Sequence, residues 1–184
     1  MKHSLLTLLA IALPVTLGWL LFAPDVLRTS PDISLLDLDG NELHLVDYRG
    51  RPLLVTFWAT TCTGCVREIP HLIELYRELA PQGLEIIGVA MNYDPPNHVL
   101  AMRDARRIPY PIALDIHADA ARAFGDVRLT PTTFLIAPDG RIVYWKSGEL
   151  DLDKLRADII GLLQQAAIAT ACNNKPQEFP SCSG

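Results

Sequence analysis

The hydrophobic and polar positions along the chain change their period several times, and each change predicts a different element. Residues 33–48 alternate apolar and polar side chains around Asp39-Gly40, a pattern typical of a β-hairpin. Residues 52–58 (PLLVTFW) form a continuous apolar run, as in a strand buried on both faces. In residues 64–80 the apolar side chains recur at steps of three and four, which predicts a helix with one buried face.

The second half of the chain continues this alternation of strands and helices. Residues 84–90 (LEIIGVA) predict a second buried strand. Asp94 is expected to cap, and Pro95 to open, a helix that ends near Arg107. The other predicted elements are a short strand at 110–115, a short helix at 118–125, a hairpin at 132–148 and an amphipathic helix at 151–167.

This order of elements predicts an α/β fold with a central mixed sheet and helices on both faces. An N-terminal hairpin and a helical insertion after the second buried strand complete the expected architecture. Cys62 and Cys65 follow the strand at 52–58 directly. Since open α/β sheets place their sites at the carboxyl ends of central strands, this junction is the first place to look for chemistry.

The N-terminal segment indicates where in the cell the protein is located. Residues 4–23 carry no charged side chain, and about 18 to 20 apolar residues are enough to cross a bilayer. We expect residues 1–23 to be a transmembrane signal anchor, with a cleaved signal peptide as the alternative. The anchor places the protein in the cell membrane as a single-pass protein whose domain faces the periplasm or another extracytoplasmic side, whereas cleavage makes it periplasmic or secreted.

The rest of the chain divides accordingly. Residues 24–30 are expected to be a linker, 31–167 a single domain, and 168–184 a tail that contains Cys172 and Cys182. The length of 184 residues and the 49% of hydrophobic residues suit one domain with appendages. The net charge of -5 argues against nucleic acid as a partner, because a phosphate-binding surface needs a basic excess.

The CxxC spacing of Cys62 and Cys65 is the strongest chemical signal in the chain. A cysteine reacts as its thiolate, and the free N–H groups and dipole of a helix start favour that anion. Cys62, at the junction, is therefore the candidate nucleophile, and Cys65 is placed one turn further in to resolve a mixed disulfide. Two structural core cysteines, or half of a zinc site, are the alternatives. Val66 excludes a c-type haem attachment, which needs His there.

Residues 53–70 (LLVTFWATTCTGCVREIP) and 129–143 (LTPTTFLIAPDGRIV) together resemble the thioredoxin superfamily. The chain looks most like its exported branch, the TlpA/ResA-like thiol–disulfide oxidoreductases, over about residues 31–165. The resemblance implies a thioredoxin fold and a redox-active disulfide between Cys62, the attacking residue, and Cys65, the resolving one. It also implies a cis Pro131 against the disulfide, and a Thr130 backbone that pairs with the substrate chain.

Two further site residues follow from the resemblance. Glu68 matches a carboxylate of the ResA-like members, and its spacing of three from Cys65 puts both on one helix face, where Glu68 could exchange the proton of that thiol. Thr61 stands where relatives usually have Trp, so part of their apolar docking surface is missing here. Trp58 is expected to form the part of that surface that is left. Thr56 replaces the buried Asp of thioredoxins proper, which raises the importance of Glu68.

The expected function is disulfide exchange with protein substrates that carry disulfides or thiols, in the reducing direction, with electrons from an upstream donor thiol protein. No cofactor and no metal is expected. A thiol peroxidase and a copper carrier that uses the cysteine pair remain as alternatives from other classes. Cys172 and Cys182 are interpreted first as a structural disulfide of the tail and second as a relay pair for Cys62 and Cys65.

Overall fold

The computed structural model describes residues 29–174, with side chains as far as Ala171. Within this part of the chain the strands form one sheet in the order β2-β1-β5-β4-β3-β6-β7. The central β3 pairs in parallel with β4 and antiparallel with β6, so the sheet is mixed. The strands are β1 (Ser34–Asp37), β2 (Glu42–His44), β3 (Leu53–Trp58), β4 (Glu85–Ala90), β5 (Ile112–Leu114), β6 (Thr132–Ile136) and β7 (Ile142–Ser147).

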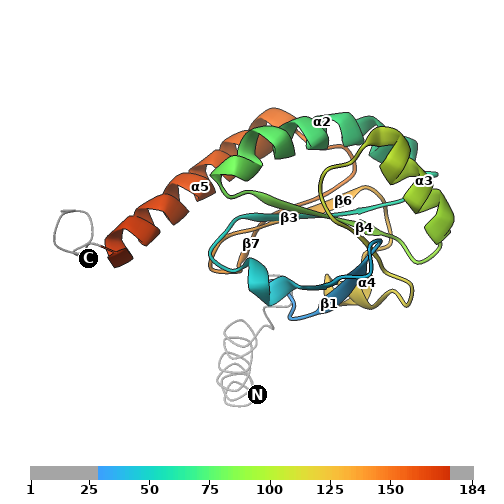
Figure 1. Cartoon of the computed structure of the whole chain (residues 1–184), viewed down its shortest axis with the longest axis horizontal. Helices are drawn as coiled ribbons and strands as arrows, with labels where there is room; N and C mark the ends of the chain where they lie inside the picture. The colour runs from blue at the N-terminus through green and yellow to red at the C-terminus, as the bar shows by residue number, and fades with distance from the viewer. Residues whose placement is uncertain (1–28, 175–184) are drawn as a thin grey trace, which may run out of the picture.

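Helices cover both faces of this sheet (Figure 1). The long helices α2 and α5 lie on one face together with α3, and the short α4 and η1 lie on the other. The fold class predicted from the alternating pattern is therefore confirmed. The helices are η1 (Leu45–Tyr48), α2 (Thr63–Leu79), η2 (Ala80–Gln82), α3 (Pro96–Arg106), α4 (Asp119–Ala123) and α5 (Leu152–Asn174).

The central strand β3 shows why its sequence is apolar throughout. Alternate residues of a strand point to opposite faces, and here both faces are covered. Leu54 and Trp58 pack into the core under α2 and α5, whereas Val55 and Phe57 pack into the core on the α4 side. Every residue of β3 is buried, and the strand therefore delivers the chain to the first turn of α2 with little freedom.

Two boundaries differ from the sequence prediction. Helix α3 begins at Pro96, with Pro95 as its N-cap residue, so Asp94 does not cap it. Helix α5 continues to Asn174, and the tail predicted to begin at residue 168 therefore begins inside this helix. The backbone of Cys172 lies in α5, but its side chain and the whole of Cys182 are outside the described residues, and their pairing stays a prediction.

The segment predicted as a membrane anchor, residues 1–23, also lies outside the described residues. Among residues 29–174, no helix has the length and apolar character needed to cross a bilayer.

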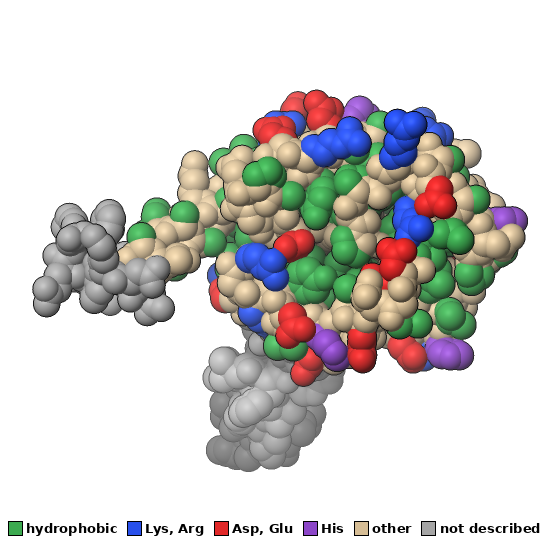
Figure 2. Space-filling view, viewed as in Figure 1, with side chains coloured by type: hydrophobic (Ala, Val, Ile, Leu, Met, Phe, Trp, Pro, Cys, Tyr) green, Lys and Arg blue, Asp and Glu red, His purple; other side chains and the backbone are tan. Residues whose placement is uncertain are grey.

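On the viewed face of the molecule, acidic and basic side chains are interspersed (Figure 2). Arg103 of α3 forms an ion pair of 2.7 Å with Asp39 of the β1–β2 turn, which ties the helical insertion to the N-terminal hairpin.

Candidate redox site

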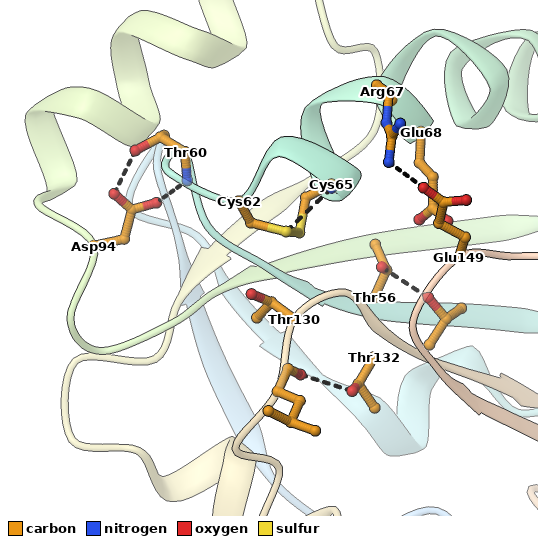
Figure 3. Close-up of a disulfide and its surroundings, with 12 residues drawn as sticks. Thr56, Thr60, Cys62, Cys65, Arg67, Glu68, Asp94, Thr130, Thr132 and Glu149 are labelled. Atoms are coloured by element: carbon orange, nitrogen blue, oxygen red, sulfur yellow. Dashed lines mark hydrogen bonds and ion pairs between the residues drawn. A yellow bond between two sulfur atoms is a disulfide. The ribbon is translucent and has the colours of Figure 1, made fainter.

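Cys62 and Cys65 form a disulfide where β3 ends and α2 begins (Figure 3). Cys62 is the N-cap residue of α2, and its Sγ accepts a hydrogen bond of 3.1 Å from the Cys65 N–H. The first N–H groups of a helix have no partner within the helix, and the sulfur of Cys62 satisfies one of them. In the reduced protein the same N–H and the positive end of the α2 dipole would stabilise a thiolate at Cys62.

The two sulfurs are unequal in exposure. Cys65 is only 3% exposed and belongs to the core under α2, whereas Cys62 is half-buried at the surface edge. An incoming thiol or disulfide can therefore approach Cys62 more readily than Cys65. This difference matches the roles expected for an attacking and a resolving cysteine.

The loop before β6 packs against the cysteine turn. The peptide bond between Thr130 and Pro131 is cis, and a Cβ placed on Gly64 would lie 3.6 Å from Cδ of Pro131. The Thr132 hydroxyl donates to the Leu129 carbonyl at 2.7 Å, which holds the loop in place. Within the described part of the chain, no backbone hydrogen bond involves Thr130, so its N–H and C=O are available to a second chain.

Glu68 lies on the buried side of α2, 7% exposed, and its Oε1 accepts a hydrogen bond of 2.7 Å from the Leu150 N–H. Glu68 and Cys65 line the same small pocket, which Pro131 also lines. The structure therefore brings Glu68 together with Cys65 and Pro131, which lie 3 and 63 positions from it along the chain. The ion pair between Arg67 and Glu149 lies beside them (Figure 3).

The surroundings of Glu68 make its carboxylate a stronger base than that of an exposed glutamate. Burial raises the pKa of Glu68 above its ordinary value, the hydrogen bond from Leu150 opposes this rise, and the negative charge of Glu149 adds to it. Burial also raises the pKa of Tyr110, with a further contribution from Glu68. A carboxyl group with a raised pKa beside Cys65 is suited to exchange a proton with that thiol.

The structure corrects the expectation for Trp58. This side chain is 5% exposed and packs on Gly88 of β4, where a Cβ would come within 3.2 Å of the indole Nε1. Trp58 lines the pocket behind Cys65 with Tyr110 and Ile69, so it cannot offer an exposed docking face. The prediction is wrong because the last residue of β3 points into the core under α2 rather than toward solvent.

Beneath the cysteines, Thr56 occupies the position where thioredoxins proper have a buried carboxylate. Its hydroxyl hydrogen-bonds the hydroxyl of Thr133 on β6 at 3.0 Å, and these residues are 4% and 0% exposed. The two threonines are direct partners in the register of β3 and β6. This position therefore holds a neutral polar pair, and Glu68 is the carboxyl group that the pocket behind Cys65 contains.

Sequence reasoning did not assign Asp94 to the site region. Its carboxylate accepts hydrogen bonds from the Thr60 N–H at 2.5 Å and from the Thr60 hydroxyl at 2.6 Å (Figure 3). The sequence carries one usable signal for this contact. Asp94 closely follows β4, which runs parallel to β3, and the carboxyl ends of neighbouring parallel strands lie at the same edge of a sheet.

Comparison with known proteins agrees with this geometry. Residues 26–145 match the model of the AhpC/TSA family. The chain is 37% identical over 146 residues to the thiol-disulfide oxidoreductase ResA of Geobacillus thermodenitrificans, covering 77% of this chain and 83% of that protein. It is 34% identical to ResA of Halalkalibacterium halodurans over 80% of this chain and 85% of the relative.

Solved structures show the same fold. A putative thioredoxin from Neisseria meningitidis superposes with a TM-score of 0.70 at 30% identity, over 75% of this chain and 91% of its own. A thiol:disulfide interchange protein of the thioredoxin family from Chlorobium tepidum superposes with a TM-score of 0.68 at 23% identity, over 74% and 96% of the two chains.

Fold and site together define a thiol–disulfide oxidoreductase with a thioredoxin fold. The chain belongs to the AhpC/TSA family and, at 37% identity over most of both chains, to the ResA-type thiol–disulfide oxidoreductases within the thioredoxin superfamily. The resemblance inferred from the two sequence motifs is confirmed, and so is thiol–disulfide exchange as the function.

Proposed function

We propose that Cys62 and Cys65 are the redox couple of this enzyme and that it reduces disulfides of extracytoplasmic proteins. One observation carries the proposal. A disulfide stands at the N-terminus of α2 with its accessible sulfur on Cys62, next to a loop at Thr130 whose backbone groups have no partner in the described part of the chain. A substrate polypeptide that pairs with Thr130 would bring its own disulfide to Cys62.

The reaction consists of two sulfur exchanges. The thiolate of Cys62 attacks a substrate disulfide, a mixed disulfide forms, and one substrate sulfur leaves as a thiolate. Cys65 then loses its proton to Glu68 and attacks the Sγ of Cys62, which releases the second substrate sulfur and forms the disulfide seen in the structure. Two electrons pass to the substrate, and a donor dithiol of another protein restores Cys62 and Cys65.

The location and the partners belong to the same proposal. The uncharged segment within residues 1–23 would anchor the protein in the membrane, with residues 31–167 exported into a compartment in which disulfides persist. The two ResA relatives are called thiol–disulfide oxidoreductases, and this name specifies no substrate. The substrate class proposed here, an extended protein segment with a disulfide, rests on the open backbone of Thr130.

A trapping experiment tests the assignment of the two cysteines. Cys65→Ser keeps the nucleophile but cannot resolve the mixed disulfide, so proteins should accumulate in disulfide linkage to Cys62. The matched control is Cys62→Ser, which should capture nothing because Cys65 is buried. Equal capture by both variants, or no reduction of insulin by the wild-type protein, would contradict the proposal. Peroxide consumption and metal retained through purification test the peroxidase and copper-carrier alternatives on the same samples.

A further inference from the structure

The buried side chain of Asp94 lies outside the pocket that contains Cys65 and Glu68, and disulfide exchange as described above makes no use of it. Its residue is 5% exposed, and both carboxylate oxygens accept hydrogen bonds from a single residue, Thr60. Among residues 29–171, no Lys, Arg or His pairs with it. A buried carboxylate is costly unless it is well hydrogen-bonded, so this arrangement calls for a reason.

Thr60 belongs to the turn that carries Cys62. The Cys62 N–H donates to the Ala59 carbonyl at 3.1 Å, which closes a turn with Thr60 and Thr61 at its centre. The N–H of a residue at the second position of such a turn has no partner inside the turn. Asp94 supplies that partner, and it takes the hydroxyl of Thr60 as well.

Asp94 is itself fixed to the sheet by two backbone hydrogen bonds. The Met91 N–H donates to the Trp58 carbonyl at 3.0 Å, and the Asp94 N–H donates to the Met91 carbonyl at 2.9 Å. These hydrogen bonds connect the end of β3 to the turn after β4. The Asp94 side chain then connects that turn to the turn before Cys62. Figure 3 shows Asp94 and Thr60 on the side of Cys62 that faces away from Glu68.

We propose that Asp94 is a positioning residue for the redox couple, which holds the turn before Cys62 and whose negative charge makes the dithiol more strongly reducing. The inference rests on the proposed function of Cys62 as the attacking residue. The positioning role follows from the two hydrogen bonds that Thr60 donates to Asp94. The effect of charge follows because reduction creates an anion at Cys62, and a fixed negative charge nearby destabilises that reduced form relative to the disulfide.

Equilibration with glutathione measures this effect. In the reaction, the protein disulfide and two glutathione thiols give the protein dithiol and one glutathione disulfide, so atoms and electrons balance. The full-length protein, purified in detergent, is compared as wild type and as Asp94→Asn, which keeps an acceptor for the Thr60 N–H but removes the charge. We expect Asp94→Asn to shift the equilibrium constant about threefold or more toward the dithiol, and a tenfold shift would correspond to about 30 mV.

A control and a second variant complete the test. Asp153→Asn removes an exposed acidic charge from the first turn of α5 and should leave the equilibrium unchanged. Thr60→Val keeps the charge of Asp94 and removes one of the two hydrogen bonds. It should slow the alkylation of reduced Cys62 about twofold or more, because the turn is held less firmly.

The outcomes separate the two proposals. If the wild-type pair does not titrate as a two-electron couple against glutathione, the proposed function fails. If it does, but Asp94→Asn stays at the wild-type equilibrium or moves toward the disulfide, only the role of Asp94 is overturned. Should Asp94→Asn not fold, Thr60→Val decides, and an alkylation rate equal to that of the wild type then refutes the role of Asp94.

Discussion

The buried hydroxyl pair of Thr56 and Thr133 allows a quantitative test of what lies beneath the redox couple. Each hydroxyl is the partner of the other at 3.0 Å, and neither residue is more than 4% exposed. Val replaces Thr with a nearly identical shape. A single Thr→Val change therefore removes one hydroxyl and leaves the other buried without its partner.

The expected free energies follow from this asymmetry. An orphaned buried hydroxyl costs about 1–3 kcal/mol, so Thr56→Val and Thr133→Val should each lower the free energy of unfolding by that amount. The double variant orphans no group and should lie within about 1 kcal/mol of the wild type. The double-mutant cycle should therefore give a coupling energy of at least about 1 kcal/mol between the two sites.

Urea unfolding of the oxidised full-length protein, monitored in detergent by the fluorescence of its tryptophans, measures all four corners of the cycle. Loss of 1 kcal/mol corresponds to roughly 2–4 °C in the melting temperature for a protein of this size, which gives an independent check. If the two single effects simply add in the double variant, each hydroxyl has another partner, and the reasoning from the Thr56–Thr133 contact is refuted.

Two further predictions concern the pocket and the rim of the site. Burial raises the pKa of Glu68, so the protonated carboxyl group stabilises the folded protein. This contribution to the free energy of unfolding is fully present below pH 4.5, the ordinary pKa, and is lost as the pH rises through the raised pKa. Glu68→Gln should therefore gain stability relative to the wild type between pH 4.5 and pH 8 in urea unfolding, and a difference independent of pH would contradict the raised pKa. Tyr93, 56% exposed with its hydroxyl 3.4 Å from Thr130 Oγ1, forms part of the rim. Tyr93→Ala should raise the KM for insulin about threefold or more and leave the reduction of a small disulfide unchanged, and equal loss with both substrates would exclude a docking role.

Carboxyl groups lie on both sides of the two cysteines, whereas position 56 holds a threonine (Figure 3). Glu68 approaches Cys65 from the α2 side, where the Leu150 N–H orients it. Asp94 lies on the opposite side and accepts two hydrogen bonds from Thr60. One group with a raised pKa and one fixed charge thus flank the two cysteines, and their separate elements allow each to be varied independently.

Much of the fold was predictable because local patterns are sufficient for it. The apolar run of β3 requires a strand covered on both faces, and the steps of three and four in α2 require one buried side. Gly40 and Gly140 adopt φ values of +84° and +87°, which explains the hairpin turns at these positions. The junction at Cys62 followed from the same patterns, because it is where a buried strand gives way to an amphipathic helix.

The sequence by itself therefore determined the redox chemistry: two cysteines one helical turn apart, at a helix start that favours a thiolate. Only the tertiary structure decided what surrounds them. The contacts of Glu68 with Leu150 and of Asp94 with Thr60 join residues 82 and 34 positions apart. The contact with Leu150 arises because β7 lies beside β6 and runs in the same direction as β3, and the contact with Thr60 arises because β4 lies parallel beside β3. The loops after β7 and β4 therefore reach the edge at which β3 ends, and no local pattern encodes this strand order.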